Sequence, residues 1–287
     1  MRTSPKPYTV PKTEWLGQGR YDTVLLQRMV VNYLTRSPNP PKSPKSVGTP
    51  TNIQPFTNHR SKHSPLRIMA INPRKTLMLI CDVQERFRSA IYGFDAMTSS
   101  ICKLVKATRV LEVPTFVTEQ NPKALGSTVE EITSLLDRKD LNQGVIAKTK
   151  FSMVTEDTIE AIDFSKYNCF ILTGIESHIC VLQTALDLLQ YRTKPKVYLA
   201  ADAVSSCNKE EVPIALRYLQ QQGVEVTSSE SLIYRLLGKC HDGPSLFAQA
   251  NASPSGDAKE PTFKYIAKLT KEEKENTTHN LQVLQPF

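Results

Sequence analysis

The sequence has no long hydrophobic run, and this absence excludes a membrane-spanning protein. None of its apolar stretches approaches the roughly 20 residues that a helix needs to cross a bilayer. The first residues form a polar stretch dotted with prolines, without the apolar core of a secretory signal. We therefore predict an intracellular protein with no membrane partner.

Glycine is missing where a nucleotide-binding loop would need it. The chain has no glycine between residues 49 and 92, and the first strand of the globular part is expected inside this interval. A dinucleotide-binding fold places a GxGxxG motif directly after that strand. The sequence therefore excludes this cofactor class, and we predict that the protein uses no cofactor.

Cysteines at metal-binding or redox spacing are also missing. The six cysteines are Cys81, Cys102, Cys169, Cys180, Cys207 and Cys240. They show no CxxC spacing and no small disulfide-rich context. We predict that most of them are reduced and buried as small apolar residues.

Acidic residues are scarce only at the start of the chain. Residues 1–68 carry 11 Lys/Arg and 2 Asp/Glu, a net charge of +9, whereas the other 219 residues carry 25 and 26, a net charge of −1. Ten of the 19 prolines also lie in residues 1–68, and proline disfavours both helices and strands. We predict a mostly disordered basic tail over residues 1–68.

Three roles for this tail stay open. Its basic, serine-containing and acid-poor composition is typical of a mitochondrial import leader, although prolines 5, 7 and 11 oppose an import helix at the first residues. It could equally be an interaction tail, or an extension of the gene model upstream of Met69. Nucleic-acid binding needs aromatic residues among the basic ones, and residues 36–68 contain only Phe56. We predict a cytoplasmic or mitochondrial protein with no nucleic-acid partner.

From residue 75 onward, short apolar runs alternate with amphipathic stretches. Strands are expected at residues 77–82, 115–118, 145–147, 169–173, 197–201 and 224–227. The stretches between them repeat apolar residues three, four or seven positions apart, which predicts helices. Apolar strands separated by helices indicate an α/β fold with a parallel sheet covered on both faces. Right-handed crossovers favour a doubly wound, six-stranded sheet in the order 3-2-1-4-5-6.

Three chemically capable residues follow strands of this predicted sheet. The ligand site of such a sheet lies where the winding reverses, after strands 1 and 4, and here Asp82 and Cys180 stand at these positions. With Ser177 as the helix N-cap, Cys180 falls in a first helical turn, which favours its thiolate. Lys148 or Lys150 follows strand 3 at the same edge, where an ammonium favours a thiolate further. Taken alone, Asp82 could be only a helix cap, Cys180 only a packed cysteine, and the lysine only an exposed surface residue.

Four segments in order resemble the isochorismatase-like cysteine hydrolases. They are CDVQERF at 81–87, VTEQNPKALG at 117–126, AKTKFSMV at 147–154 and TGIESHICVLQTALDLL at 173–189. The resemblance is closest to the eukaryotic members, particularly their second, mitochondrial type. It implies a hydrolase domain over residues 69–240. Residues 241–287 would then hold an insertion, a C-terminal helix that resumes the resemblance at 263–272, and a tail.

The resemblance implies a catalytic triad of Asp82, Lys148 and Cys180. Lys148 is preferred over Lys150 because the family places its lysine three residues before an aromatic residue, here Phe151. In the implied mechanism Asp82 takes the thiol proton, Lys148 stabilises the thiolate and the substrate anion, and Cys180 attacks a carbonyl carbon. Water then hydrolyses the resulting acyl-enzyme.

The resemblance also implies how the substrate is held. A non-proline cis peptide between Ile175 and Glu176 would aim the backbone N–H groups of the turn from Glu176 to Cys180 at the substrate oxygen. The candidate substrate-binding residues are Gln84, Phe87, Glu119, Gln120, Phe151 and His178.

One departure from the family narrows the substrate. Nicotinamidases of this fold bind a metal through histidines that follow strand 2, but residues 119–144 contain no histidine. We therefore predict no metal and disfavour nicotinamide, and isochorismate is disfavoured as well. We prefer a small amide, ureide or carbamoyl compound as the substrate. We also predict that the enzyme is a homo-oligomer. The alternative is a catalytically silent protein that binds or regulates partners through its fold and basic tail.

Overall fold

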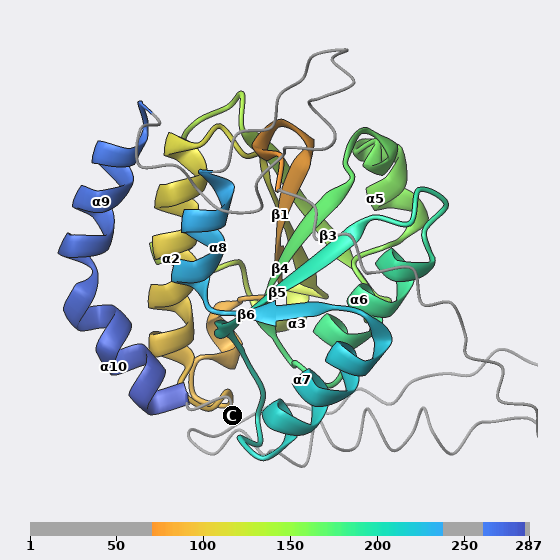
Figure 1. The fold of residues 1–287 in the computed structure, drawn as a ribbon. Coiled ribbons are helices and arrows are strands. Elements are labelled where there is room, and N and C mark those ends of the chain that lie inside the picture. Colours follow the sequence, from red (N-terminus) through yellow and green to blue (C-terminus); the bar gives the residue numbers. More distant parts are fainter. Residues whose placement is uncertain (1–70, 238–260, 285–287) are drawn as a thin grey trace, which may run out of the picture. The chain divides into compact units, whose positions relative to one another are not determined.

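The computed structural model describes residues 71–237 and 261–284. They contain a six-stranded parallel sheet in the order β3-β2-β1-β4-β5-β6 (Figure 1). The strands are β1 Thr76–Cys81, β2 Thr115–Gln120, β3 Asn142–Lys148, β4 Cys169–Ile175, β5 Lys196–Ser205 and β6 Glu225–Thr227. The predicted fold class and strand order are confirmed. The predicted tail over residues 1–68 lies outside the described residues.

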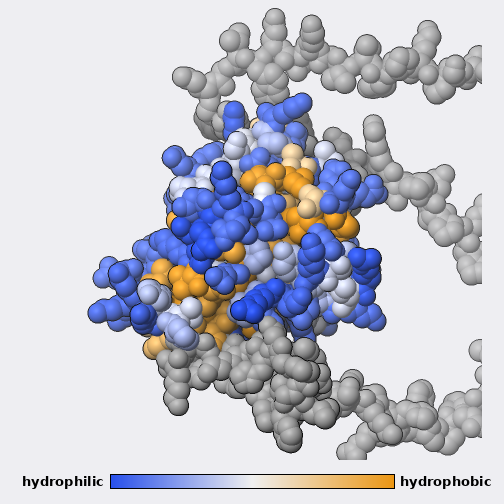
Figure 2. Space-filling model, turned by 90° about the horizontal axis from the view of Figure 1, so that it is seen from above, coloured by the Kyte–Doolittle hydropathy of each residue, from blue (hydrophilic) through white to orange (hydrophobic). Residues whose placement is uncertain are grey.

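Helices cover both faces of the sheet. On one face lie α2 Phe94–Val110 and α8 Ser229–Leu236, and on the other lie α5 Glu156–Ala161, α6 Cys180–Gln190 and α7 Glu211–Gln222 (Figure 1). Short elements join them: η1 Pro73–Lys75, η2 Glu85–Phe87, α3 Pro122–Leu125, α4 Glu130–Thr133 and η3 Phe164–Lys166. None of the helices in the described ranges is long and apolar enough to span a bilayer. Figure 2 shows one face of the molecule, on which hydrophilic residues surround separate hydrophobic areas.

The central strands explain why the apolar runs are continuous. Every residue of β1 and β4 is buried, because helices shield both faces of the sheet at its centre. The outer strands β3 and β6 are mostly half-buried or exposed instead. Each fully buried large apolar side chain contributes about 1.5–3 kcal/mol to stability. The sheet is therefore held most firmly at β1 and β4, whose carboxyl ends carry Asp82 and the turn toward Cys180.

A glycine allows these two strands to approach closely at that end. Gly174 of β4 pairs with Cys81 of β1 and has a φ of 125°. A Cβ atom at Gly174 would lie 2.2 Å from the backbone oxygen of Cys81. Any other residue here would push β1 and β4 apart, so Gly174 fixes the spacing of the strand ends.

The C-terminal segment forms two helices where one was expected. Helices α9 Phe263–Glu272 and α10 Lys274–Leu284 pack against α2. Polar side chains of α2 make part of this contact: Lys103 Nζ donates to Thr277 Oγ1 at 2.9 Å, and Asn280 Nδ2 donates to Ser100 Oγ at 3.0 Å. The predicted insertion before these helices lies almost wholly outside the described residues.

Candidate active site

Two strained residues mark the carboxyl ends of the central strands. Asp82 directly follows β1 and Glu176 directly follows β4, and each has a φ of 56°. Non-glycine residues adopt this left-handed conformation at a cost and only uncommonly. The predicted cis peptide between Ile175 and Glu176 is wrong, since all peptide bonds of the described residues are trans. The chain leaves β4 through the left-handed backbone of Glu176 instead.

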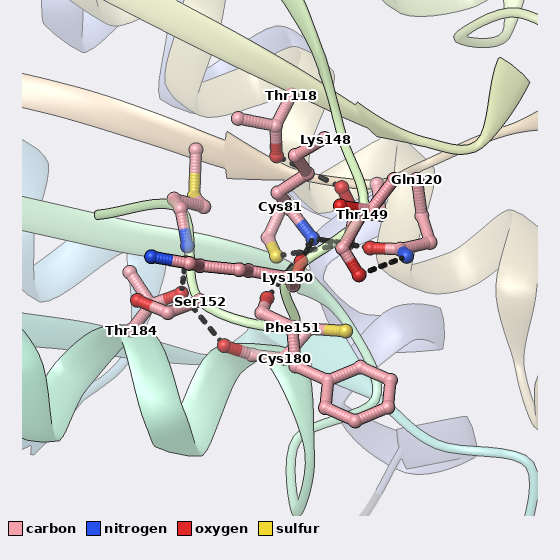
Figure 3. Close-up of polar contacts among 12 residues, drawn as sticks. Cys81, Thr118, Gln120, Lys148, Thr149, Lys150, Phe151, Ser152, Cys180 and Thr184 are labelled. Atoms are coloured by element: carbon pink, nitrogen blue, oxygen red, sulfur yellow. Dashed lines mark hydrogen bonds and ion pairs between the residues drawn. The ribbon is translucent and has the colours of Figure 1, made fainter. Parts of the chain in front are cut away.

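Lys148 is the centre of the polar cluster at this edge. It ends β3, is buried, and its Nζ atom lies close to four oxygen atoms (Figure 3). These are Asp82 Oδ2 at 2.6 Å, Gln120 Oε1 at 2.8 Å, the Phe151 carbonyl at 2.9 Å and the Lys150 carbonyl at 3.1 Å. An ammonium has three N–H donors, so all of them are used. Lys148 can therefore act on a substrate through its charge, and not through a free N–H group.

The surroundings keep this ammonium protonated. Burial by itself lowers the pKa of Lys148, but the neighbouring Cys81, Asp82 and Cys180 side chains outweigh burial and raise the pKa above its usual value. Lys150 contributes only its backbone carbonyl to the cluster, and its exposed side chain points away in Figure 3. The geometry thus supports Lys148 over Lys150.

Asp82 is held in one orientation by three side chains. Thr118 Oγ1 donates to Asp82 Oδ1 at 2.8 Å, while Lys148 binds Oδ2. The thiol of Cys81 lies 3.5 Å from the same Oδ2 atom. The carboxylate is almost fully buried and its charge is balanced by one ammonium.

Cys180 is the first residue of α6, so it lies in the first helical turn as expected. The N-cap, however, is Ile179, and the predicted cap Ser177 binds Ser206 Oγ through its hydroxyl at 2.6 Å. Thr184 Oγ1 donates to the backbone oxygen of Cys180 at 2.7 Å, which fixes the start of the helix. The positive end of the α6 dipole therefore lies at Cys180.

The turn before Cys180 offers fewer free donors than expected. Ile179 N donates to the Glu176 carbonyl at 2.9 Å, and Ser177 N donates to Ser206 Oγ at 2.9 Å. These two N–H groups are committed to the protein. An oxyanion hole in this turn therefore has to use the N–H groups of other residues, that of Cys180 included.

Gln84, a candidate substrate-binding residue, also supports the end of β2. Gln84 is fully buried. Its Oε1 atom accepts a hydrogen bond from the Gln120 backbone N–H at 2.7 Å, and its Nε2 atom donates to the Gln120 backbone carbonyl at 3.1 Å. Its second amide hydrogen goes to the Gly126 carbonyl at 2.6 Å. Gln84 thus holds the end of β2 in place, and with it the Gln120 side chain that binds Lys148.

The other candidate substrate-binding residues differ in how much of their surface is buried. Glu119 Oε1 accepts hydrogen bonds from Thr128 N and Oγ1 at 2.7 and 2.9 Å, and Phe87 is buried in the core. Phe151 and His178 are only half-buried. Glu119 and Gln120 are half-buried as well, so four of the six candidate substrate-binding residues keep some surface for a ligand.

Glu176 belongs to a second polar group beside the cluster. Cys207 Sγ donates to Glu176 Oε1 at 2.8 Å, and His178 Nδ1 lies 3.4 Å from Oε2 and 3.1 Å from Ser206 Oγ. Burial, followed by the contact with Glu176, raises the pKa of Cys207 to about 12. Cys207 is therefore a hydrogen-bond donor here and not a competing nucleophile.

Cys81 is the site residue that the sequence analysis missed. It is fully buried at the end of β1, and its side chain contacts that of Cys180. Burial, then the contact with Cys180 and the charge of Asp82, raise its pKa well above the usual value, although Lys148 opposes them. The signal was its place directly before Asp82, which the apolar pattern of β1 masked.

No metal site is evident in the part of the chain that the structure describes. There, no three His, Cys, Asp or Glu side chains gather in a way that could hold a metal ion.

Known proteins share this fold and much of this sequence. The isochorismatase domain pattern matches residues 76–231. Isochorismatase domain-containing protein 2 of Xenopus laevis is 34% identical, over 72% of this chain and 88% of its own length. The MAR1 ribonuclease structure from Caenorhabditis elegans is 35% identical with a TM-score of 0.59, and the match covers 70% of this chain and 91% of that one. YcaC from Escherichia coli, an octameric hydrolase of unknown specificity, shares the fold at 16% identity, with a TM-score of 0.51 over 72% of this chain and 97% of its own.

Proposed function

The chain belongs to the isochorismatase family, and we propose that it is a cysteine hydrolase acting on a small amide, ureide or carbamoyl compound. The observation that carries this proposal is the buried ammonium of Lys148, which Asp82 holds at 2.6 Å and whose pKa responds to Cys180 at the start of α6. A helix N-terminus and a fixed positive charge together favour a thiolate nucleophile.

The chemistry follows from these three side chains. The thiol proton of Cys180 passes to Asp82, and the sulfur attacks the carbonyl carbon of the substrate. Lys148 stabilises the developing negative charge through space, and the N–H group of Cys180 donates to the oxyanion. Asp82 returns the proton to the departing amine, which leaves a thioester on Cys180. Asp82 then takes a proton from water, and the hydroxide releases the acid and regenerates the thiol.

The burial of the reacting groups supports a small substrate. The relative exposures of Asp82, Lys148 and Cys180 are 1%, 5% and 6%. A compound of a few heavy atoms can reach groups so little exposed, whereas a polymer has to insert a single protruding group.

The C. elegans relative supports RNA as a second candidate substrate, because that protein is named a ribonuclease. RNA binding needs a basic surface, and the excess positive charge of this chain lies in residues 1–68, at +9, whereas residues 69–287, which hold the proposed reacting groups, carry a net charge of −1. The small-molecule proposal therefore remains the preferred one.

A substrate screen tests the proposal. Wild-type protein and Cys180→Ala are incubated with a library of small amides, ureides and carbamoyl compounds, and separately with single-stranded RNA. We expect wild type alone to consume one compound class and to carry an acyl adduct on Cys180 by mass spectrometry. Cys102→Ala, altered on the half-buried thiol of α2, is the matched control and should keep the activity. Consumption that persists in Cys180→Ala would contradict the cysteine mechanism. RNA cleavage without compound turnover would favour the second candidate, and binding without turnover the silent alternative.

Assembly and location are proposed separately. We propose a homo-oligomer, which the octameric E. coli relative supports, in the cytoplasm or the mitochondrion.

A further inference from the structure

A second thiol lies beside the proposed nucleophile, and the hydrolytic mechanism does not use it. Cys81 ends β1, and Cys180 begins the helix that follows β4, the strand paired with β1. Both side chains belong to the same buried core cluster. Figure 3 shows both cysteines in the same part of the molecule as Lys148.

Both cysteine side chains interact with the same ammonium, that of Lys148. The side chains of Cys81 and Cys180 contact each other, and both act on Lys148. Cys81 Sγ also lies 3.5 Å from Asp82 Oδ2. Cys81 is therefore a thiol next to a carboxylate that can accept its proton, while Cys180 lies at the N-terminus of α6.

We propose that Cys81 and Cys180 form an oxidative modification site, in which Cys81 resolves the oxidised form of Cys180 as a reversible disulfide. The inference rests on the thiolate of Cys180 proposed above, but it needs no substrate. The oxidant is a peroxide, with hydrogen peroxide as the simplest case.

The chemistry balances in two steps. The Cys180 thiolate attacks one oxygen of hydrogen peroxide, the O–O bond breaks, and Cys180 becomes a sulfenic acid while hydroxide leaves. Cys81 then attacks the Cys180 sulfur, the S–S bond forms and the S–O bond breaks. Asp82 takes the Cys81 proton and passes it to the departing hydroxide, which leaves as water. Two thiols and one peroxide thus give one disulfide and two waters.

The arrangement gives this pair an advantage over the other thiols nearby. Cys207 donates its hydrogen to Glu176, and Cys102 donates to the Glu131 carbonyl at 3.3 Å, so neither is held at the Lys148 cluster. A disulfide at Cys180 would stop hydrolysis and would protect the nucleophile from irreversible oxidation to the sulfinic acid. The hydrolase would then be switched off by peroxide and restored by a thiol reductant.

Peroxide treatment followed by mass spectrometry tests the proposal. Reduced full-length protein is treated with a small excess of hydrogen peroxide, remaining thiols are alkylated in denaturant, and peptides are mapped with and without dithiothreitol. We expect a linked Cys81–Cys180 peptide pair with a loss of about 2 Da, reversed by dithiothreitol. In Cys81→Ser, Cys180 should instead gain about 32 Da as the sulfinic acid and should not recover.

Cys102→Ser and Cys207→Ser are the matched controls, and both should still form the linked pair. The wild-type map decides the matter even if Cys81→Ser folds poorly. Sulfinic acid on wild-type Cys180 without linkage to Cys81, or linkage of Cys180 to another cysteine, would overturn the proposal while leaving the nucleophile intact. Cys180 that resists both peroxide and iodoacetamide would instead overturn the nucleophile itself, and with it the proposed function.

Discussion

Two buried lysine–aspartate pairs occur in the described part of the chain, and they differ in their N–O distance, in their place in the fold and in the direction of the lysine pKa shift. Lys148 and Asp82 lie 2.6 Å apart at the carboxyl ends of β3 and β1, whereas Lys103 of α2 and Asp202 of β5 lie 3.9 Å apart. Lys148 is surrounded by acceptors and thiols that raise its pKa. Burial dominates at Lys103 and lowers its pKa, despite the charge of Asp202.

The difference teaches that position in the sheet, and not residue type, separates a chemical site from a structural one. Asp202 is held by the N–H and hydroxyl of Ser229 at the start of α8, and Lys103 donates to Thr277 of α10. This pair therefore joins helices to the sheet. The Lys148 pair instead faces the cysteine at the start of α6, so its charge can serve a reaction.

The largest expected difference between the pairs is in catalysis. Asp82→Asn removes the proton acceptor and should lower the hydrolysis of an activated ester, such as 4-nitrophenyl acetate, by about 10²–10⁴-fold. Asp202→Asn should leave the rate unchanged, because Asp202 touches none of the reacting groups. Stopped-flow absorbance of nitrophenolate release measures both variants. Equal losses in the two would show that the effect is on folding and not on proton transfer.

The next difference is in stability. Lys148→Met leaves Asp82 buried without its cation and should lower the free energy of unfolding by about 3–5 kcal/mol. Lys103→Met should cost less than about 2 kcal/mol, since Asp202 keeps its two bonds from Ser229. Urea unfolding followed by circular dichroism compares them. A loss as large in Lys103→Met as in Lys148→Met would contradict this ranking.

The pairs should also respond oppositely to alkaline pH. The pKa of Lys103 is lower in the folded than in the unfolded chain, so between these values the unfolded chain binds more protons and stability rises with pH. The pKa of Lys148 is raised, so its contribution is present below about pH 10 and is lost as pH rises through the folded value. Urea titrations from pH 8 upward should show wild type gaining stability relative to Lys103→Met. If the stability difference between wild type and Lys103→Met stays constant or decreases as the pH rises, the pKa of Lys103 is not lowered in the folded chain.

The smallest contrast is among the thiols near each pair. Burial raises the pKa of Cys102, the neighbour of Lys103 on α2, to about 11, and that of Cys207 to about 12. Among the cysteines that the structure describes, iodoacetamide at pH 7 should therefore label Cys180 first, because within this set only Cys180 combines a helix N-terminus with the Lys148 charge. Peptide mapping over time gives the order, and faster labelling of Cys102 or Cys207 would reverse the assignment.

The sheet order was predictable because burial on both faces leaves a visible mark, the continuous apolar runs of β1 and β4. Asp82, Lys148 and Cys180 were predictable because parallel strands bring their carboxyl ends to one edge. The family resemblance was needed to prefer Lys148 over Lys150.

Other features depend on side-chain and backbone geometry that no spacing encodes. The wrong expectations were the cis peptide before Glu176 and the helix cap at Ser177. The support that Gln84 gives to the end of β2 was not anticipated either. Cys81 was missed because a cysteine inside an apolar run has the pattern of a core residue. Its chemistry appears only when β4 and α6 bring Cys180 against it.

The pH dependence of Cys180 alkylation in Lys148→Met and Lys150→Met tests the central claim most directly. Both variants remove one lysine, and the two lysines are only two residues apart, but only the Lys148 side chain lies in the cluster. With folding confirmed by circular dichroism, Lys148→Met should slow the reaction of Cys180 with iodoacetamide at pH 7 by about tenfold or more, with recovery at higher pH. Lys150→Met should match wild type. Equal changes in the two variants, or an unchanged profile in both, would contradict the claim that Lys148 activates Cys180.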